Sequence, residues 1–412
     1  MSRIEMHSTV TIRLSNAAVA LSLCAGVAQA GEFGDFLSQG NVLIDARLRF
    51  EGVQQAGFVH NASATTARLR LGYQTAFLWD FQALVELQTT GHLTNTFNDT
   101  VTGNVTYPVV ADPENFALNR AQLTFTGLPQ TSITAGRQRI NLDDQRFIGA
   151  SAFRQNEQTF DGVRLTNTSF DNLSLDYTYV DRVNRVFTER GSQGHFTGDI
   201  NLFNAAYDWT PVGKIVAYAY LLDLHNAATL STQTYGVSVS GKRAVGDAVS
   251  ITYLAEGATQ SDFGSNPHRF SLGYARGELG LASGIYSALG GVELLDGNGV
   301  VGFSTPLATL HKFQGTADVF LTTPTKGIID AYGKLGIQMT NLSWGPLTGA
   351  SLFGWYHDFE SARGGSLGSE FDFESRFNFD KHYAVSVAYA TYAGVTGFAS
   401  RDKIWLAVEV NY

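Results

Sequence analysis

The sequence lacks the long hydrophobic run that a membrane-spanning helix needs. After the N-terminal segment, the longest unbroken apolar stretch is the eight residues from Ile215 to Leu222, whereas a spanning helix needs roughly 20. Proline and methionine are also scarce, at 8 and 3 of 412 residues, beside 43 glycines and 28 phenylalanines. Aromatic residues favour strands and glycine serves tight turns. The composition therefore excludes a helical multipass protein and favours an all-β chain.

Cysteine is almost absent, because the only one, Cys24, lies inside a segment typical of a secretory signal peptide. Basic residues precede an apolar stretch there, and Ala28-Gln29-Ala30 provides a small-x-small cleavage pattern. We expect a cleaved signal peptide over residues 1–30 and a cysteine-free mature chain over residues 31–412. A chain without thiols crosses an oxidising periplasm without mispairing. It also has no thiol for catalysis or metal binding.

Positive charge is in deficit. The whole chain carries a formal net charge of −9, and the signal peptide contains two Arg and one Glu, so the mature chain carries −10. Binding to nucleic acid depends on a basic face that neutralises phosphates. The charge balance therefore argues against a nucleic-acid partner.

Apolar and polar residues alternate along the mature chain in segments of about ten residues, which is the period of half-buried strands. From Val42 to Phe50 the even-numbered residues are apolar, while charged residues occupy odd positions. From Glu370 to Phe379 the same alternation sets phenylalanines against acidic, basic and amide side chains. We count 18 such segments.

The connections between these segments are short and long by turns. Outer-membrane barrels have short periplasmic turns, long external loops and a polar interior, and 16 to 18 strands leave an aqueous lumen. We therefore predict one transmembrane antiparallel β-barrel of 18 strands over residues 31–412, with both termini in the periplasm. The short links are 76–80, 127–130, 168–172 and 380–382, and the long ones are 90–116, 139–159, 183–195 and 290–326.

The last segment carries apolar side chains at every second position up to an aromatic C-terminus, namely Ile404, Leu406, Val408, Val410 and Tyr412. This pattern resembles the assembly signal of outer-membrane barrels. We expect the protein to lie in the outer membrane of a Gram-negative bacterium, with membrane lipid and the barrel-assembly machinery as partners.

Three short stretches match or nearly match catalytic or nucleotide-binding patterns, and each lacks the required context. Gly364 to Gly368 fits G-x-S-x-G but has no strand–turn–helix around it. Gly297 to Gly302 fits G-x-G-x-x-G but no helix follows, and Gly236 to Lys242 has phosphate-loop spacing followed by Arg243. The nine histidines form no H-E-x-x-H pattern. We expect no catalytic residue, no metal and no cofactor.

Arginine is concentrated in the first half, where 13 of the 19 mature arginines lie before residue 191 and lysine is absent. Two interpretations remain open. The arginines could form a ladder for anionic solutes, since the planar guanidinium pairs with carboxylates through two hydrogen bonds. They could instead pair with Asp45, Glu51, Glu86, Asp161 and Asp176 and only stiffen the wall. The predicted pore-lining residues are Arg47, Arg49, Arg68, Arg70, Arg120 and Arg164, opposed by an acidic arc of Glu370, Asp372 and Glu374.

The link from 290 to 326 is far longer than structureless loops commonly are. It contains an apolar series that would be costly to leave in water, namely Val300, Phe303, Leu307, Leu310, Phe313, Phe320 and Leu321. We predict that it folds into the barrel and presents His311, Lys312 and Asp318 at a constriction. The alternative is that it packs over the rim or against a neighbouring subunit.

Several long motifs resemble the alginate-export family of outer-membrane, porin-like barrels. This resemblance implies an 18-stranded barrel with an arginine-rich lumen and covers residues 40 to 412. The motifs are Gly136 to Gln138, Asp144 to Gly149, Phe153 to Asp161, Thr305 to Phe313, Phe320 to Pro324 and, more weakly, Tyr356 to Phe359.

Together these features predict an outer-membrane channel for passive diffusion of small or oligomeric polar solutes, with a preference for anions. A dedicated exporter of an acidic polysaccharide such as alginate is the alternative within transport. An outer-membrane hydrolase is disfavoured because outward strand positions are almost entirely apolar or tyrosine. An adhesin or receptor function of the loops stays open, as do the solute, the direction of transport and the oligomeric state.

Overall fold

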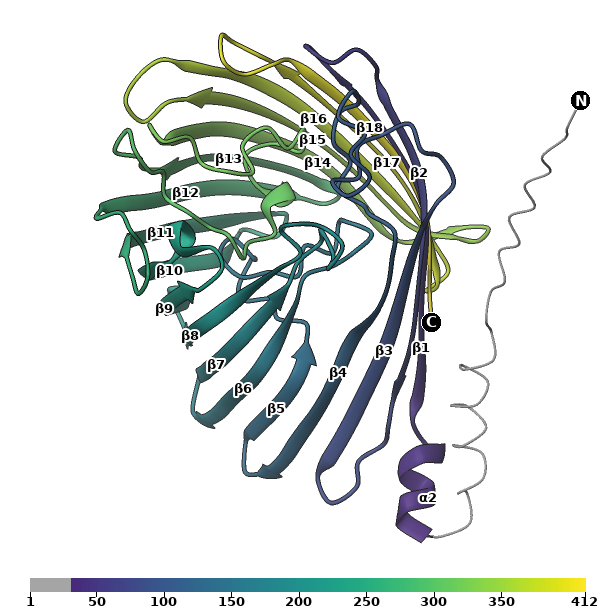
Figure 1. Ribbon diagram of the computed structural model, residues 1–412. Helices are drawn as coiled ribbons and strands as arrows, with labels where there is room; N and C mark the ends of the chain where they lie inside the picture. The colour runs from purple at the N-terminus through teal and green to yellow at the C-terminus, as the bar shows by residue number, and fades with distance from the viewer. Residues whose placement is uncertain (1–30) are drawn as a thin grey trace, which may run out of the picture.

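The computed structural model describes residues 31–412, so the predicted signal peptide lies outside the described residues. The chain forms one closed antiparallel sheet of 18 strands, in which each strand pairs with its neighbour in sequence and β1 pairs with β18 (Figure 1). The predicted fold class and strand number are confirmed. The strands are β1 (Asn41–Gln55), β2 (Ala62–Gln74), β3 (Phe81–His92), β4 (Asn115–Leu128), β5 (Thr131–Gln138), β6 (Thr159–Phe170), β7 (Leu173–Asn184), β8 (His195–Trp209), β9 (Gly213–Leu224), β10 (Thr232–Val245), β11 (Val249–Asp262), β12 (Ser271–Ser283), β13 (Tyr286–Leu295), β14 (Ile328–Trp344), β15 (Leu347–Glu360), β16 (Ser366–Phe379), β17 (Tyr383–Ala393) and β18 (Arg401–Asn411).

Helical structure is confined to short pieces. They are α2 (Gly31–Ser38), η1 (Ala228–Leu230) and η2 (Leu310–Lys312). In the described part of the chain, no helix has both the length and the apolar character needed to cross a membrane. Helix α2 lies beside the turn between β2 and β3, where the Ala76 amide donates to the Phe36 carbonyl over 3.1 Å.

Alternation along each strand separates two faces of the wall. On β2, Leu69 and Leu71 are exposed on the outside, whereas Arg68 and Arg70 are buried inside. On β18 the outward residues begin with Ile404, and Leu406 and Val408 follow at every second position. The outer surface is therefore an apolar band that suits lipid, as in outer-membrane barrels.

Pairing of the first and last strands closes the sheet. β1 and β18 are joined in register from Asp45 opposite Asn411 to Gln55 opposite Arg401. The Ile44 amide donates to the Tyr412 carbonyl over 2.9 Å, and the Tyr412 amide donates back over 2.8 Å. The Tyr412 ring stacks on His382 with centroids 3.9 Å apart. The ladder thus extends to the last residue and leaves no open edge.

The short turns gather at one end of the barrel and the long loops at the other, as the sequence predicts (Figure 1). Three long loops matter for the site: L3 (residues 139–158), L4 (residues 185–194) and L7 (residues 296–327). The expected start of L7 at residue 290 is wrong. Gly290 and Gly291 stay in β13 and pair with Leu279 and Glu278, because glycine does not interrupt a strand held on both sides.

The closed ladder predicts an unusual resistance to detergent. The mature protein extracted from membranes should be rich in β-structure, and its mobility in a dodecyl sulfate gel should change on boiling, because no strand can peel away from a free edge. Gel mobility and circular dichroism measure this. A helical spectrum, or full solubility without detergent, would contradict the fold.

Candidate functional site: the lumen and its inward loops

Loop L7 folds into the barrel, as predicted. Phe303 and Leu307 are fully buried, and Phe320 packs against the inner wall with its ring 4.8 Å from that of Phe359. Figure 1 shows the loop, with the short helix η2, crossing the inside of the barrel. Two members of the predicted apolar series, Val300 and Leu321, are exposed instead. They line a cavity next to the folded part of the loop.

Loop L3 also folds inward, which the sequence analysis missed. The Phe147 ring lies 5.1 Å from Tyr218 and 5.3 Å from Tyr274 on the inner wall, and Ile140 and Ile148 are fully buried. The apolar residues of L3 were a usable signal, since the same reasoning correctly placed L7. L3 is shorter than L7 and richer in arginine, so its apolar residues stand out less in the sequence.

The two loops are hydrogen-bonded to each other inside the barrel, and we call them the inner loop pair. The Gly149 amide donates to the Leu307 carbonyl over 2.9 Å, and the Thr309 amide donates to the Gln145 carbonyl over 3.1 Å. The Gln158 side chain donates to the same Leu307 carbonyl over 3.0 Å. L3 and L7 therefore narrow the lumen as one unit.

Arg146 is the buried joint between L3, L7 and the wall. Its Nε donates to Glu293 on β13 over 2.5 Å, its Nη1 to Thr305 over 3.1 Å and its Nη2 to Gln314 over 3.3 Å. The guanidinium also lies over the ring of Phe313, with its carbon 4.8 Å from the centroid. One side chain from L3 thus binds two residues of L7 and a strand.

The predicted arginines divide into covered and open ones. Arg49, Arg68 and Arg70 face inward and are buried, and Arg49 donates to the Phe153 carbonyl of L3 over 2.5 Å. These three do not contribute an open surface for a solute. Arg47 is partly buried and also binds L3, because its Nη1 donates to the same Phe153 carbonyl over 2.8 Å. Arg120 and Arg164 are partly buried without a hydrogen bond or ion pair to L3 in the described chain.

Every carboxylate proposed as a partner does pair with an arginine. Arg120 binds Glu86 at 2.6 Å, and Arg164 binds Asp176 at 2.5 Å. The other pairs are Arg68 and Arg70 with Asp45, Arg49 with Glu51 and Asp112, Arg137 with Asp161, and Arg47 with Glu409. The salt-bridge interpretation is therefore the one that the geometry supports for most of the wall.

Two members of the acidic arc support L7 rather than line a path. Glu370 accepts from the Ala317 amide over 2.7 Å, and Asp372 accepts from the Thr316 hydroxyl over 2.6 Å. Both carboxylates are buried. Glu374, the third member, is half-buried and has no ion pair within the described chain.

Asp318 is the second anchor of L7. Its carboxylate lies 2.6 Å from Arg154, 2.7 Å from Lys403 and 2.7 Å from His311. Burial by itself would raise the pKa of Asp318, but His311, Lys403 and Arg154 outweigh that effect and hold the pKa well below its ordinary range. His311 also stacks on Phe153 with centroids 3.5 Å apart.

Of the three residues predicted at the constriction, only Lys312 is exposed. His311 and Asp318 bind each other within the anchor, because a buried carboxylate must be paired. The Lys312 ammonium donates to the Asp144 carbonyl over 2.7 Å and has no carboxylate within ion-pair distance in residues 31–412. His311 and Asp318 are bound in the anchor but also line the cavity beside L4, so the exposure of all three residues to the solute path stays a prediction.

In several ion pairs of the wall and of L3, the cation is more exposed than its carboxylate. Side-chain exposure is 42% for Arg376 against 13% for Glu409, and 32% for Arg139 against 0% for Glu157. In the Arg68–Asp45 and Arg276–Asp144 pairs the order is reversed, and the carboxylate is the more exposed partner. Lys334 on β14 adds a cation without a carboxylate partner in the described chain, and its ammonium lies 4.1 Å and 4.3 Å from the rings of Phe353 and Trp355.

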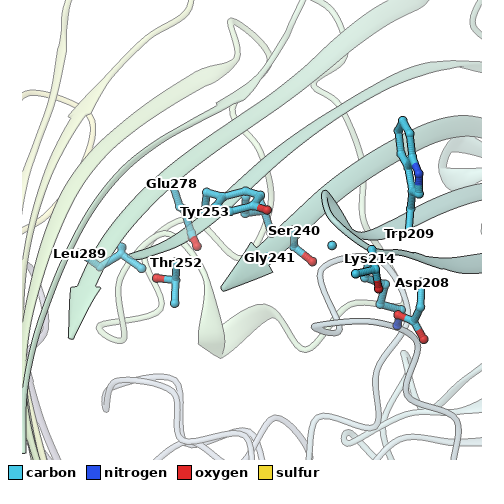
Figure 2. A pocket seen from close by; sticks show the side chains of 12 residues that line it. Asp208, Trp209, Lys214, Ser240, Gly241, Thr252, Tyr253, Glu278 and Leu289 are labelled. Atoms are coloured by element: carbon cyan, nitrogen blue, oxygen red, sulfur yellow. The ribbon is translucent and has the colours of Figure 1, made fainter. Parts of the chain in front are cut away.

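Two cavities flank the inner loop pair. One, of about 890 Å³, is lined by L3, L4, L7 and the start of β18. The other, of about 660 Å³, lies at the end of the barrel that carries the short turns. Figure 2 shows this second cavity with Thr252, Tyr253 and Glu278 on one side and Asp208 and Lys214 on the other.

Known proteins share the family and the fold of this chain. A sequence profile described as alginate export matches residues 39–269. No curated protein matches the chain significantly. Among solved structures, OccAB4 of Acinetobacter baumannii is 14% identical, with a TM-score of 0.68 over 90% of this chain and 98% of the other.

Two further solved structures come from Pseudomonas aeruginosa. OpdL is 16% identical, with a TM-score of 0.67 over 91% of this chain and 99% of the other. OccK2 (OpdF), solved in complex with glucuronate, is 12% identical, with a TM-score of 0.64 over 90% and 98%. At these identities, the similarity establishes the barrel fold.

Removing the Arg146 joint should loosen the inner loop pair. Arg146→Gln leaves Glu293 buried without its cation, and breaking one partner of a buried pair costs about 3 to 5 kcal/mol. We expect larger and noisier single-channel currents in planar bilayers from a barrel that still changes gel mobility on boiling. Arg190→Gln on exposed L4 is the matched control. Equal, quiet currents from both variants would contradict the joint.

The ion pairs of Asp318 should persist as the pH is lowered, until the pH falls below about 4. A carboxylate whose folded pKa is depressed stabilises the fold above its unfolded pKa, about 3.9, and that stability is lost as pH falls through the folded value. Single-channel conductance should therefore stay constant from pH 7 to about 4. Asp318→Asn should give unsteady currents across the whole range, whereas Asp199→Asn, an exposed site on β8, should not. A conductance step in the wild type near pH 6 would contradict this.

Proposed function

Because the chain belongs to the alginate export family of outer-membrane β-barrels, we propose that it is a passive channel for small polar solutes that carry negative charge. The observation that carries the proposal is the set of open cations in the lumen: Lys334, Arg164 and Arg376 on the inner wall, Arg139 on L3 and Lys312 on L7. Fixed charges in a low-dielectric wall raise the local concentration of the opposite ion. An anion entering the lumen would meet these groups before their shielded carboxylates.

The inner loop pair supports a preference for small solutes. L3 and L7 occupy the middle of an 18-stranded barrel that would otherwise leave a wide aqueous lumen. Their contacts with the wall are ion pairs and aromatic packing, so the loops would act as a fixed restriction. A solute would pass beside Lys312, the open cation of η2. Such passage needs no catalytic residue and no cofactor.

Export of an acidic polysaccharide is the second candidate, because the matching family is described by alginate export. A polymer would have to pass the inner loop pair in single file along the same cations. Oligomers of alginate added on the periplasmic side should then interrupt the current in proportion to their length. Interruption by single uronate sugars, with none by longer oligomers, would favour the channel for small solutes.

We also propose that the last strand is recognised by the barrel-assembly machinery. Tyr412 stacks on His382, and its hydroxyl lies 2.6 Å from that of Tyr383, so the terminal ring is fixed at the end of β18. Deleting Tyr412 should lower the amount of folded barrel in the membrane without changing the conductance of the molecules that do assemble.

Charge reversal at the open cation tests the proposal. Lys312→Glu should shift the reversal potential in a salt gradient toward cation preference, because it places a negative charge at the restriction. Lys381→Glu makes the same change in the turn between β16 and β17, outside the lumen, and should leave the reversal potential unaltered. A wild-type channel that prefers cations, or identical potentials in the two variants, would overturn anion selection.

A further inference from the structure

The cavity between L4 and the inner loop pair has an uncompensated positive charge. Its lining includes four permanent cations, Arg154, Arg185, Arg401 and Lys403, and one carboxylate, Asp318. Arg154 and Lys403 both bind Asp318 and Glu51 behind the lining, so these four charges cancel. Arg185 and Arg401 remain, and neither has a carboxylate within ion-pair distance in residues 31–412.

Arg185 is held in a fixed position by aromatic rings. Its guanidinium carbon lies 4.8 Å from the Phe187 ring centroid and 4.3 Å from that of Phe196. Only Nη1 has protein partners, the carbonyl and side chain of Gln193 at 3.1 Å and 3.2 Å. Nε and Nη2, the edge that pairs best with a carboxylate, have no hydrogen-bond partner in the described chain and are not sealed from solvent.

Arg401 adds charge from the opposite wall. Its Nη1 donates to the carbonyls of Ala317 and Asp318, each over 2.8 Å, and its Nε is buried without a partner in the described chain. Carbonyl oxygens carry no full charge, so the guanidinium remains a net cation. A buried cation without a counter-ion is costly unless a mobile anion can approach it.

Apolar rings make up much of the remaining lining. Phe153, Phe270, Phe303 and Phe320 border the cavity in addition to the two phenylalanines around Arg185. Rings favour stacked or edge-on contact with another flat group. A volume of about 890 Å³ accommodates a small organic molecule with water around it. An inorganic anion would pair with the arginines but would make no contact that requires the phenylalanine rings.

We infer that this cavity is a binding site for organic anions that carry a carboxylate on a flat apolar ring, with the free edge of Arg185 as the pairing group. The inference deepens the proposed function and rests on it, since a site beside L4 would capture a solute before it reaches Lys312. The carboxylate pairs with Nε and Nη2 of Arg185, and the ring packs among the phenylalanines. Arg401 contributes long-range attraction.

Calorimetric titration of the folded, detergent-solubilised barrel tests the site with benzoate as the probe. Acetate carries the charge without the ring, and benzamide carries the ring without the charge. Benzoate should bind more tightly than either. Arg185→Gln should weaken benzoate binding by about tenfold or more, as expected for loss of a hydrogen bond to a charged group. Arg190→Gln removes an exposed arginine from the same loop and should have no effect.

Each result decides between alternatives. Equal binding of benzoate and acetate would overturn the role of the rings, and equal affinity of the Arg185→Gln and Arg190→Gln variants would overturn the assignment to Arg185. Arg185→Lys, which keeps the charge but loses the fork, should bind benzoate with intermediate affinity. The change of gel mobility on boiling confirms that each variant is folded. A cation-selective channel that still binds benzoate through Arg185 would reject the proposed function and keep the site.

Discussion

The structure depends on one constraint, which is that every backbone N–H and C=O group in the hydrocarbon layer must find a partner within the protein. The 18 strands meet it by closing on themselves, with β1 bonded to β18 and the ladder running to Tyr412. Closure at this strand number creates a wide interior. The wall faces lipid on one side, so charged side chains such as Arg68 and Arg70 are directed inward.

A charged interior creates a second problem, because L3 and L7 enclose part of it and exclude water. The arginines and carboxylates beneath the loops then have to pair with each other or with loop carbonyls. Arg49 and Arg70 bind L3, Glu370 and Asp372 bind L7, and Arg146 binds both loops to β13. The guanidinium suits this work because its five donors reach several acceptors at once. Part of the arginine ladder in the sequence, namely Arg47, Arg49 and Arg70, thus holds L3 in place.

The fold could be predicted from the sequence because alternation has a period fixed by strand geometry, and each strand repeats it. The inward course of L7 followed from its length and apolar residues. L3 carries apolar residues too, among them Ile140 and Ile148, but it is shorter and richer in arginine, so its inward course was not predicted. The parity of Arg70 gave its facing, but its contact with L3 depends on Gln155, a residue 85 positions further along the chain, whose carbonyl accepts from the Arg70 guanidinium. Which face of the wall a residue lies on can be predicted from its own strand, whereas its burial by a loop depends on residues far away in the sequence.

The pairing of arginines with carboxylates also determines which charges a solute can meet in the lumen. A cation that is more exposed than its carboxylate, as Arg139 is relative to Glu157 within L3, keeps its field on the open side even though the pair is neutral overall. The overall acidity of the chain therefore says little about its lumen, because the field at the path depends on the order of charges from the wall inward. Arg185 is the extreme case within the described chain, since phenylalanine rings and Gln193 fix it without supplying a negative charge. Selectivity in such a barrel follows from the charges that the loops leave uncovered.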